Sequence, residues 1–358
     1  MRICYVAHAN SHFTIPYVDY FASRGHEVHL VSFHPGDLPN AIMHHPAGRA
    51  FDPEKHKWPY LLNAGKAIRM IREVKPDILH AHYVSSNGLL AVASGVHPLV
   101  LSARGDDVLI ATRNYFRRRL ISTILQRADL VNPVSAQLEE RVLSLGVRRD
   151  RILRLTQGVT GGDFLVDRGQ RRPGPIRMIC TRRLAPEYQC DRIVGALSRL
   201  AGQATAWEFL FAATGPMEGA LRQQVGEANL TGAVRFLGGF AQPDLPQLLG
   251  DADIYVSASV SDGTSPALLE AMASGAFPVV SDIPANREWL SGQGDGLLFD
   301  RTSARQLARH LTRAMEDEPL RRMAVAINRK RVAERGDRET NMGILATAYE
   351  RLLRPHSP

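Results

Sequence analysis

The chain has 358 residues, which is enough for two domains of ordinary size. Its composition, 44% hydrophobic and 22% charged, is typical of a soluble globular protein, and no apolar run reaches membrane-spanning length. The three cysteines, Cys4, Cys180 and Cys190, lack metal-ligand spacing, so we expect reduced thiols in a cytosolic protein without disulfide, metal or cofactor. Residues 1–6 read as the start of a strand and not as a signal peptide.

The net charge of +8 is unevenly distributed. Residues 1–165 carry 20 basic and 14 acidic residues (+6), and residues 166–358 carry 24 and 22 (+2). The excess is concentrated at 113–119, Arg-Asn-Tyr-Phe-Arg-Arg-Arg, in a predicted helix that continues to Arg127. Such a surface attracts an anionic membrane or an anionic acceptor, and a solvated helix face explains it equally well. No binding motif indicates a nucleic-acid partner.

The first half of the chain alternates strands and helices, as in a parallel α/β domain. We predict strands at 3–7, 28–32, 78–81, 99–102, 128–133 and 152–155, with helices at 16–24 and 61–74. The turn after the first strand, Ala-His-Ala-Asn-Ser-His, lacks the Gly-x-Gly-x-x-Gly of dinucleotide-binding domains, which disfavours a dehydrogenase. Asn10 and His12 in this turn either line a ligand site or cap the next helix.

Polar residues follow two of these strands, at the edge where open α/β sheets bind ligands. His82 comes directly after the strand at 78–81, and Arg104, Asp106 and Asp107 follow the strand at 99–102. The last three either contact an acceptor or form a turn. The histidine-rich segment 34–60 lacks supporting carboxylates, so we expect a surface loop there and no metal site.

A linker rich in Gly, Pro and Arg at 167–175 separates a second strand–helix alternation, which starts at Ile176. Further strands are predicted at 209–212, 234–237, 254–257 and 277–281. Arg182 and Arg183 follow the first strand of this half, and turns with Gly215 and Gly238 follow the next two. A final helix at 339–353 has one apolar face.

The segment 259–275 has the features of an anion site. Ser265-Pro266 is a helix start and Gly275 a helix end. The backbone N–H groups of residues 263–265, Gly-Thr-Ser, then lie at the positive end of the helix dipole, which favours a phosphate. Asp262 and Glu270 flank this position and suit sugar hydroxyls and a ribose diol, although a solvated helix-cap loop is the simpler alternative.

Residues 262–280 resemble the donor-binding signature of the retaining glycosyltransferases of family 4, which have two glutamates with seven residues between them and an Ala-Met-Ala-x-Gly-x-x-Pro-Val-Val run. Glu270 matches the second glutamate, residues 271–280 match the run, and Asp262 replaces the first glutamate. The His-x-His at 80–82 is similar to the histidine motif of the family's first domain, and Arg183 matches its diphosphate-binding arginine. Tyr188 stands where the family usually has a lysine, so we expect Arg182 to replace the missing charge.

The resemblance implies an α/β GT-B fold, in which two Rossmann-like domains face each other across a cleft and a C-terminal helix crosses back to the first. The first, acceptor-side domain would be 1–165 with 339–358, and the second, donor-binding domain 166–338. The implied function is metal-independent retaining transfer of a sugar, by a front-face mechanism, from a nucleotide-diphosphate-sugar, preferably a UDP-sugar. The acceptor hydroxyl would belong to a carbohydrate or lipid-linked acceptor in polysaccharide or glycolipid assembly at the inner membrane face.

The resemblance, together with the strand-end positions of Asn10, His12 and residues 104–107, also assigns roles to residues. The catalytic residues would be His82, Asp262 and Arg183; the donor-binding residues Glu270, Gly263, Thr264, Ser265, Arg182, Gly215, Gly238 and Asn10; and the acceptor-side residues Arg104, Asp106, Asp107 and His12. A GT-B nucleotide-sugar epimerase, or a nucleotide-sugar-binding protein that has lost catalysis, remains the alternative.

Overall fold

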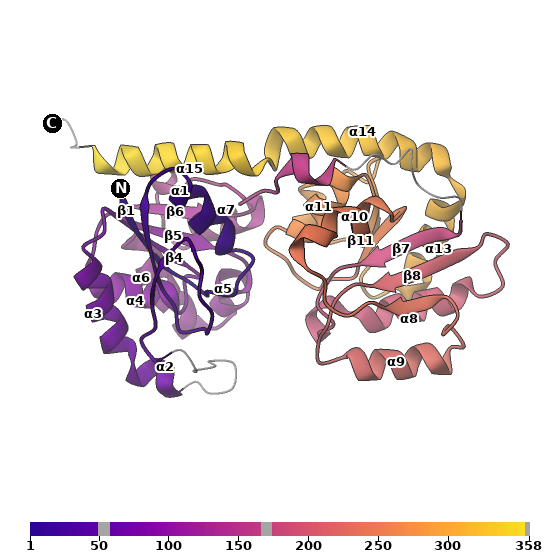
Figure 1. Cartoon of the computed structure of the whole chain (residues 1–358), viewed down its shortest axis with the longest axis horizontal. Coiled ribbons are helices and arrows are strands. Elements are labelled where there is room, and N and C mark those ends of the chain that lie inside the picture. Colours follow the sequence, from indigo (N-terminus) through magenta and orange to yellow (C-terminus); the bar gives the residue numbers. More distant parts are fainter. Residues whose placement is uncertain (49–57, 166–173, 355–358) are drawn as a thin grey trace. The chain divides into compact units, whose positions relative to one another are not determined.

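The computed structural model describes residues 1–48, 58–165 and 174–354, which form two compact units. The first unit comprises Met1–Gln157 and the chain from Thr340 on, and the second comprises Gly158–Glu339 (Figure 1). We expected the boundary at 165/166, but residues 158–165 belong to the second unit because Val159 pairs with Asp337 and Phe164 joins that unit's core. Most of the predicted linker, residues 167–173, and part of the histidine-rich loop, residues 49–57, lie outside the described residues.

The strands of the first unit are β1 (Arg2–Val6), β2 (Glu27–Val31), β3 (Ile42–His44), β4 (Ile78–His82), β5 (Leu99–Ala103) and β6 (Leu130–Pro133). Those of the second unit are β7 (Ile176–Cys180), β8 (Trp207–Phe211), β9 (Val234–Phe236), β10 (Ile254–Ser257), β11 (Phe277–Ser281) and β12 (Leu297–Phe299).

The α-helices of the first unit are α1 (Ile15–Ala22), α2 (Trp58–Leu62), α3 (Ala64–Val74), α4 (Asn87–Ser94), α5 (Asp106–Leu109), α6 (Tyr115–Gln126) and α7 (Ala136–Ser144). Those of the second are α8 (Cys190–Leu197), α9 (Glu218–Glu227), α10 (Leu245–Gly250), α11 (Pro266–Ser274), α12 (Pro284–Arg287), α13 (Ala304–Glu316) and α14 (Glu318–Arg335). The last helix, α15 (Arg338–Leu353), runs from the second unit into the first.

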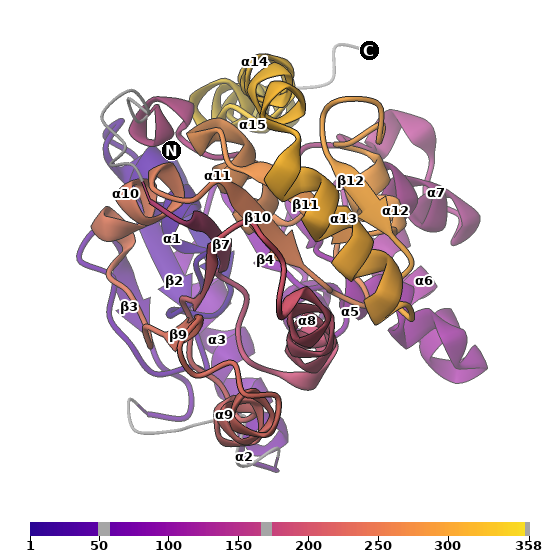
Figure 2. The same ribbon diagram turned by 90° about the vertical axis from the view of Figure 1, so that its right-hand side faces the viewer.

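Within the described residues, each unit is built on a six-stranded sheet whose strand pairs are all parallel. The first sheet has the order β3-β2-β1-β4-β5-β6, and the second has the order β12-β11-β10-β7-β8-β9. Both are the doubly wound order, in which the chain reverses direction across the sheet after its third strand. The reversal points lie between β1 and β4 and between β7 and β10, which can be compared in Figures 1 and 2.

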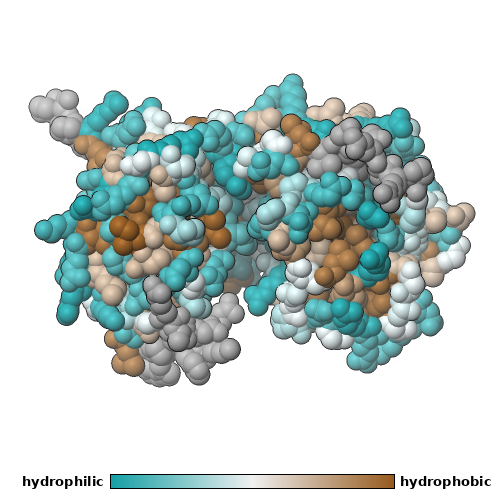
Figure 3. Space-filling view, viewed as in Figure 1, coloured by the Kyte–Doolittle hydropathy of each residue, from teal (hydrophilic) through white to brown (hydrophobic). Residues whose placement is uncertain are grey.

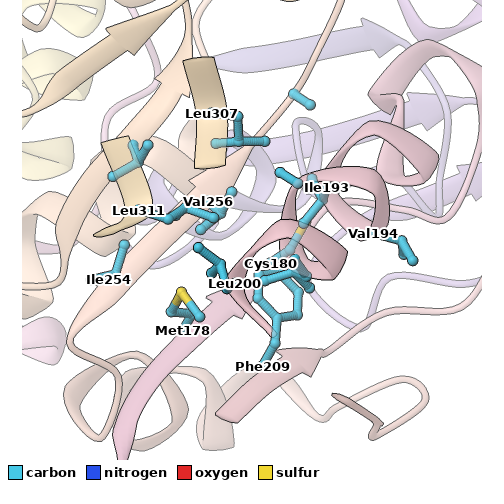
Figure 4. Close-up of a cluster of buried hydrophobic side chains, with 14 of the residues drawn as sticks. Met178, Cys180, Ile193, Val194, Leu200, Phe209, Ile254, Val256, Leu307 and Leu311 are labelled. Carbon is cyan, nitrogen blue, oxygen red and sulfur yellow. The ribbon is translucent and has the colours of Figure 1, made fainter. Parts of the chain in front are cut away.

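The strands read as continuous apolar runs because helices cover both faces of each sheet. Along β1, Ile3 and Tyr5 enter one core cluster while Cys4 and Val6 enter the other. In the second unit, Met178 and Cys180 of β7 pack with Ile254 and Val256 of β10 and with helices α8 and α13 (Figure 4). On the face shown in Figure 3, hydrophilic residues surround smaller hydrophobic areas.

The final helix confirms the prediction for 339–353: Leu345 and Tyr349 are fully buried in the core of the first unit, and Leu352 is partly buried there. Within the described residues, no helix is long and apolar enough to cross a bilayer.

Two predicted elements differ from the structure. Residues 152–155 were expected as a strand, but they form only an isolated bridge, between Val131 and Ile152, although the N–H groups of Leu153 and Leu155 donate to carbonyls of β6. The predicted helix 61–74 is divided into α2 and α3, with Asn63 capping α3. Asn63 has a non-helical backbone and makes no side-chain capping hydrogen bond, so the division reflects the low preference of asparagine for a helix interior.

Candidate functional site

The candidate residues of each unit gather at the carboxyl ends of strands beside the reversal point. In the second unit, Arg182 follows β7 and Asp262 follows β10, which are neighbouring strands. In the first unit, Asn10 follows β1 and His82 ends β4, which are also neighbours. Open α/β sheets bind ligands at this position because the loops diverge there and leave a crevice.

Arg182 is the centre of the cluster in the second unit. Its guanidinium donates to the Ser265 hydroxyl over 2.6 Å and contacts the Asp262 carboxylate over 3.0 Å. The same group lies 4.2 Å from the centre of the Tyr188 ring. The side chains of Arg182 and Asp262 are only 9% and 15% exposed, so their charges interact with little screening by water. This arrangement fixes the position of the Asp262 carboxylate.

Arg183, the residue that matches the family's arginine, lies exposed beside this cluster. One glycine shapes the loop that carries it, and a second allows a turn further along the chain. A Cβ on Gly215 would lie 2.3 Å from the Leu184 carbonyl oxygen, because the 182–184 loop packs directly on the turn after β8. Gly238 has a φ of 76°, which favours glycine over other residues. Gly215 therefore supports the loop, and Gly238 allows the turn after β9.

The start of helix α11 was predicted in detail, and this prediction is confirmed. Ser265 is the N-cap and accepts a hydrogen bond from the Leu268 N–H, Pro266 is the first residue, and Gly275 is the left-handed C-cap. Gly263, Thr264 and Ser265 are all buried. The helix has nine residues, and its positive end lies beside Arg182, whose charge is paired with the Asp262 carboxylate.

Glu270 lies on α11 and is partly exposed. Burial raises the pKa of its carboxyl group from 4.5 to about 7, while Arg338 and Arg182 act in the opposite direction. A glutamate with this pKa changes its protonation state near neutral pH. Within the described residues, no group of three or more His, Cys, Asp or Glu side chains is placed to hold a metal.

In the first unit, the structure brings His82 and Arg104 together. Both are buried, and Arg104 Nη2 lies 3.2 Å from His82 Nε2. A guanidinium only donates, so Nε2 must accept, and His82 is a neutral ring with its proton on Nδ1. Burial, assisted by the Arg104 charge, lowers the pKa of His82 well below its ordinary value, in agreement with that state. In the described residues His82 Nδ1 is buried without a hydrogen-bond partner.

The other predicted residues of the first unit differ in their surroundings. The Asp107 carboxylate is buried and accepts hydrogen bonds from the N–H groups of Val84, Arg104 and Gly105, so its contacts are those of a turn-forming residue. Asp106 is exposed at the start of α5.

Asn10 and His12 are both exposed, and neither caps α1, whose N-cap is Thr14. The Asn10 amide packs against Gly36, where a Cβ would lie 1.9 Å from its Oδ1.

His80, which is separated from His82 by one residue, has a structural role. Asn132 Nδ2 donates to the carbonyls of Leu153 and Leu155, so its Oδ1 accepts from Ser102 Oγ. Ser102 Oγ in turn accepts from His80 Nε2, and His80 Nδ1 accepts from the Tyr349 hydroxyl over 2.5 Å. This network is fully satisfied and attaches α15 to the first unit.

Two contributors were missed by the sequence analysis. The Tyr17 ring packs edge-on against His82, with 4.7 Å between the ring centres. Its ring centre also lies 4.9 Å from Cζ of Arg104. Arg338 opposes the rise in the pKa of Glu270. No local pattern marks either residue, because each reaches its partner only through long-range packing.

Comparisons with known proteins agree with this architecture. A family model described as "Glycosyl transferases group 1" matches residues 164–331, and one described as "Glycosyl transferase 4-like" matches residues 2–135. The chain is 26% identical over 289 residues to a phosphatidyl-myo-inositol mannosyltransferase of Mycolicibacterium smegmatis, covering 79% of this chain and 71% of that protein. It is 29% identical over 196 residues to WcaL of Salmonella typhimurium, which is 52% of this chain and 48% of WcaL. The chain thus spans about half the length of the first curated relatives it matches.

Solved structures share the fold over nearly the whole chain. Sucrose-phosphate synthase from Thermosynechococcus elongatus has a TM-score of 0.85 at 16% identity and covers 98% of this chain and 99% of its own. Anabaena HepE, in complex with UDP and glucose, has a TM-score of 0.80 at 17% identity, with 98% and 99% coverage. The fold and the two family models together show that the chain belongs to the family 4 (group 1) glycosyltransferases and has the two-domain α/β GT-B fold.

Proposed function

We propose that the protein transfers a sugar from a nucleotide-diphosphate-sugar to an acceptor hydroxyl with retention of the anomeric configuration. The observation that carries this proposal is the junction of Arg182, Asp262 and Ser265 at the reversal point of the second sheet. It combines a fixed carboxylate, which accepts hydrogen bonds from sugar hydroxyls, with positive potential suited to a diphosphate.

Each charged group then has a distinct task. Arg183, exposed at the edge of the cluster, contacts the donor diphosphate, and Arg182 supplies further positive potential while it positions Asp262. The ionised Glu270 accepts hydrogen bonds from the ribose diol. In the first unit, the Nδ1–H group of His82 donates to a sugar hydroxyl.

In the proposed step, the bond between the sugar C1 and the donor phosphate oxygen breaks while the acceptor oxygen bonds to C1 on the same face. The acceptor's proton passes to the leaving phosphate oxygen. Arginines and the α11 N-terminus stabilise the negative charge that develops on the diphosphate, so the step needs no metal. The nucleoside of the donor is proposed to be uridine, since the similar HepE structure holds UDP.

The acceptor is proposed to be a carbohydrate or a lipid-linked carbohydrate. The matched relatives include a phosphatidyl-myo-inositol mannosyltransferase and the amylovoran biosynthesis glycosyltransferase AmsK of Erwinia amylovora, whose names indicate glycolipid and polysaccharide assembly. The proposed place of action is the cytoplasmic side of the membrane.

A thermal-shift screen of UDP, GDP, ADP and their sugars tests donor binding. A ligand at 100 times its Kd stabilises the folded state by about 2.7 kcal/mol, which is readily detected as a higher Tm. Glu270→Ala should abolish the shift, whereas Glu227→Ala, an exposed glutamate on α9, should retain it. If no nucleotide stabilises the wild type, the proposal fails.

NMR of the reaction then reads the product. A retained anomeric configuration supports the proposed step, and an inverted product rejects it. Incubation with donor alone separates a transferase from an epimerase, because only an epimerase converts the donor sugar without an acceptor.

A further inference from the structure

Helix α6 has an anomalous surface for a helix of a globular domain. Every residue from 113 to 120 is exposed, and the first buried residue is Ile121. Its inner face, Ile121, Ile124 and Leu125, joins the core of the first unit only from the second turn on. The first turns of α6, magenta in Figure 2, therefore bury nothing in this unit.

Three of the exposed residues have large apolar side chains. Tyr115 is 69% exposed, Phe116 is 80% exposed and Leu120 is 46% exposed. Phe116 and Leu120 are four residues apart and share one face of the helix, and the Tyr115 ring meets Phe116 edge-on at 5.7 Å. An exposed aromatic and aliphatic cluster of this kind marks an interaction surface.

Arginines interrupt this apolar cluster. Arg113, Arg117, Arg118 and Arg119 are all exposed, and no acidic residue occurs between Asp107 and Asp129. Three of these arginines lie near the N-terminus of α6, where the helix dipole is positive and cations reduce helix stability. Their position does not serve folding, so it indicates an external anionic partner.

We propose that the first turns of α6 dock the protein on an anionic membrane surface, with Tyr115, Phe116 and Leu120 entering the headgroup region. Arginines around an apolar, aromatic cluster match the two components of such a surface, namely lipid phosphates and the acyl boundary. This inference deepens the proposed function, since it identifies a lipid surface as the place where a lipid-linked acceptor is met.

The position of α6 along the chain supports this role. It follows the carboxyl end of β5 after only α5 and a short 3₁₀ helix, and Arg141 Nε fixes that connection by donating to Thr112 Oγ1 over 2.8 Å. The same β5 end carries Arg104, the partner of His82. A membrane bound at α6 would thus lie on the side of the first unit where acceptor contacts are expected.

Vesicle co-sedimentation of the full chain tests the inference, with phosphatidylcholine vesicles that contain or lack phosphatidylglycerol. The wild type should bind the anionic vesicles and lose binding as salt rises. Replacing Arg117, Arg118 and Arg119 by Ala should lower the partition coefficient by about a hundredfold, at roughly fivefold for each arginine. Phe116→Ser should lower it by about tenfold. The matched control Leu62→Ser, an 81% exposed leucine on α2, should bind like the wild type.

A second readout locates the contact. A tryptophan introduced as Phe116→Trp should be quenched by brominated lipid in anionic vesicles. Equal binding of the arginine variant and the wild type would overturn the inference. The inference would also be overturned if the arginine variant lost affinity for duplex DNA and kept its affinity for vesicles, because the surface would then bind nucleic acid.

The thermal shift with donor distinguishes this inference from the proposed function. All α6 variants should keep the donor response, since α6 belongs to the first unit and the proposed diphosphate- and ribose-binding residues belong to the second. Vesicle binding without a donor response would reject the transferase proposal alone, and the reverse result would reject only the membrane inference.

Discussion

Arg182 and Asp262 are joined across the reversal point of the second sheet, with Nη2 of the arginine 3.0 Å from Oδ2 and 3.2 Å from Oδ1 of the aspartate. Both side chains are largely buried, and the Ser265 hydroxyl completes the arginine's contacts. The pair thereby connects the loop after β7 to the N-terminus of α11.

The pair predicts a cost in both stability and turnover. Asp262→Asn leaves a buried guanidinium without its counter-ion, so urea denaturation should show a loss of about 3 kcal/mol in the free energy of unfolding. Asp163→Asn, an exposed aspartate of the same unit, should change it by less than about 0.5 kcal/mol. Arg182→Ala should also lose turnover, and near-wild-type turnover would contradict a role for Arg182 at the donor diphosphate.

Tyr188 should act through its ring, since the Arg182 guanidinium lies 4.2 Å from the ring centre. Tyr188→Phe keeps that face and should leave the Tm unchanged. Tyr188→Leu should lower the free energy of unfolding by about 1 kcal/mol. Tyr188→Lys should lower it further, because a second cation then lies against Arg182. A stabilising Tyr188→Lys change would show that the arginine does not occupy the lysine's electrostatic position.

Glu270 predicts a pH-dependent stability. Its folded-state pKa of about 7 lies above the ordinary 4.5, so between these values the folded state holds the proton more tightly. The contribution of Glu270 to stability is therefore present below about pH 4.5 and is lost as pH rises through 7. Glu270→Gln should match the wild type at the acidic end and exceed it by about 1 to 3 kcal/mol at pH 8. A difference in the free energy of unfolding between Glu270→Gln and the wild type that stays the same at every pH, measured by urea denaturation, would contradict this.

The same titration should control donor affinity. Protonation removes acceptor capacity from Glu270, so donor binding to the wild type should weaken as pH falls below about 7. The Gln variant should bind donor weakly at every pH. Calorimetric titration across this range measures both trends, and a pH-independent wild-type affinity would argue against a ribose contact.

His82 should contribute to turnover through a hydrogen bond and should not change its protonation state in the pH range of the assay. Since burial lowers the pKa of His82 well below its ordinary value, the pH–rate profile should lack a limb from this residue near pH 6.5. His82→Phe removes the Nδ1–H donor and should lower kcat/KM by about tenfold to a hundredfold. His310→Phe, on α13, serves as the control and should retain activity.

Tyr349 should hold α15 on the first unit through its hydroxyl. Tyr349→Phe leaves His80 Nδ1 without its buried donor, which should lower the free energy of unfolding by about 1 to 3 kcal/mol. Tyr115→Phe, where the hydroxyl belongs to an exposed side chain, should have no measurable effect. Equal stabilities of the two variants would show that apolar packing alone attaches the helix.

Features that depend on neighbouring residues were predictable from the chain. Ser265, Pro266 and Gly275 set the ends of α11, because capping depends on a few adjacent residues. The apolar runs of β1, β7 and β10 indicated strands buried on both faces, and the strand-end position of His82 followed from that pattern.

Other features arose only from contacts between distant segments. The adjacent arginines 182 and 183 are chemically equivalent in the sequence, yet the first is buried by Asp262 and Ser265 and the second is exposed. His80 and His82 likewise point to different partners, Tyr349 and Arg104. Local patterns specify where a strand or helix begins and ends, whereas the burial and charge state of a side chain depend on which remote groups the folded chain brings within a few ångströms of it.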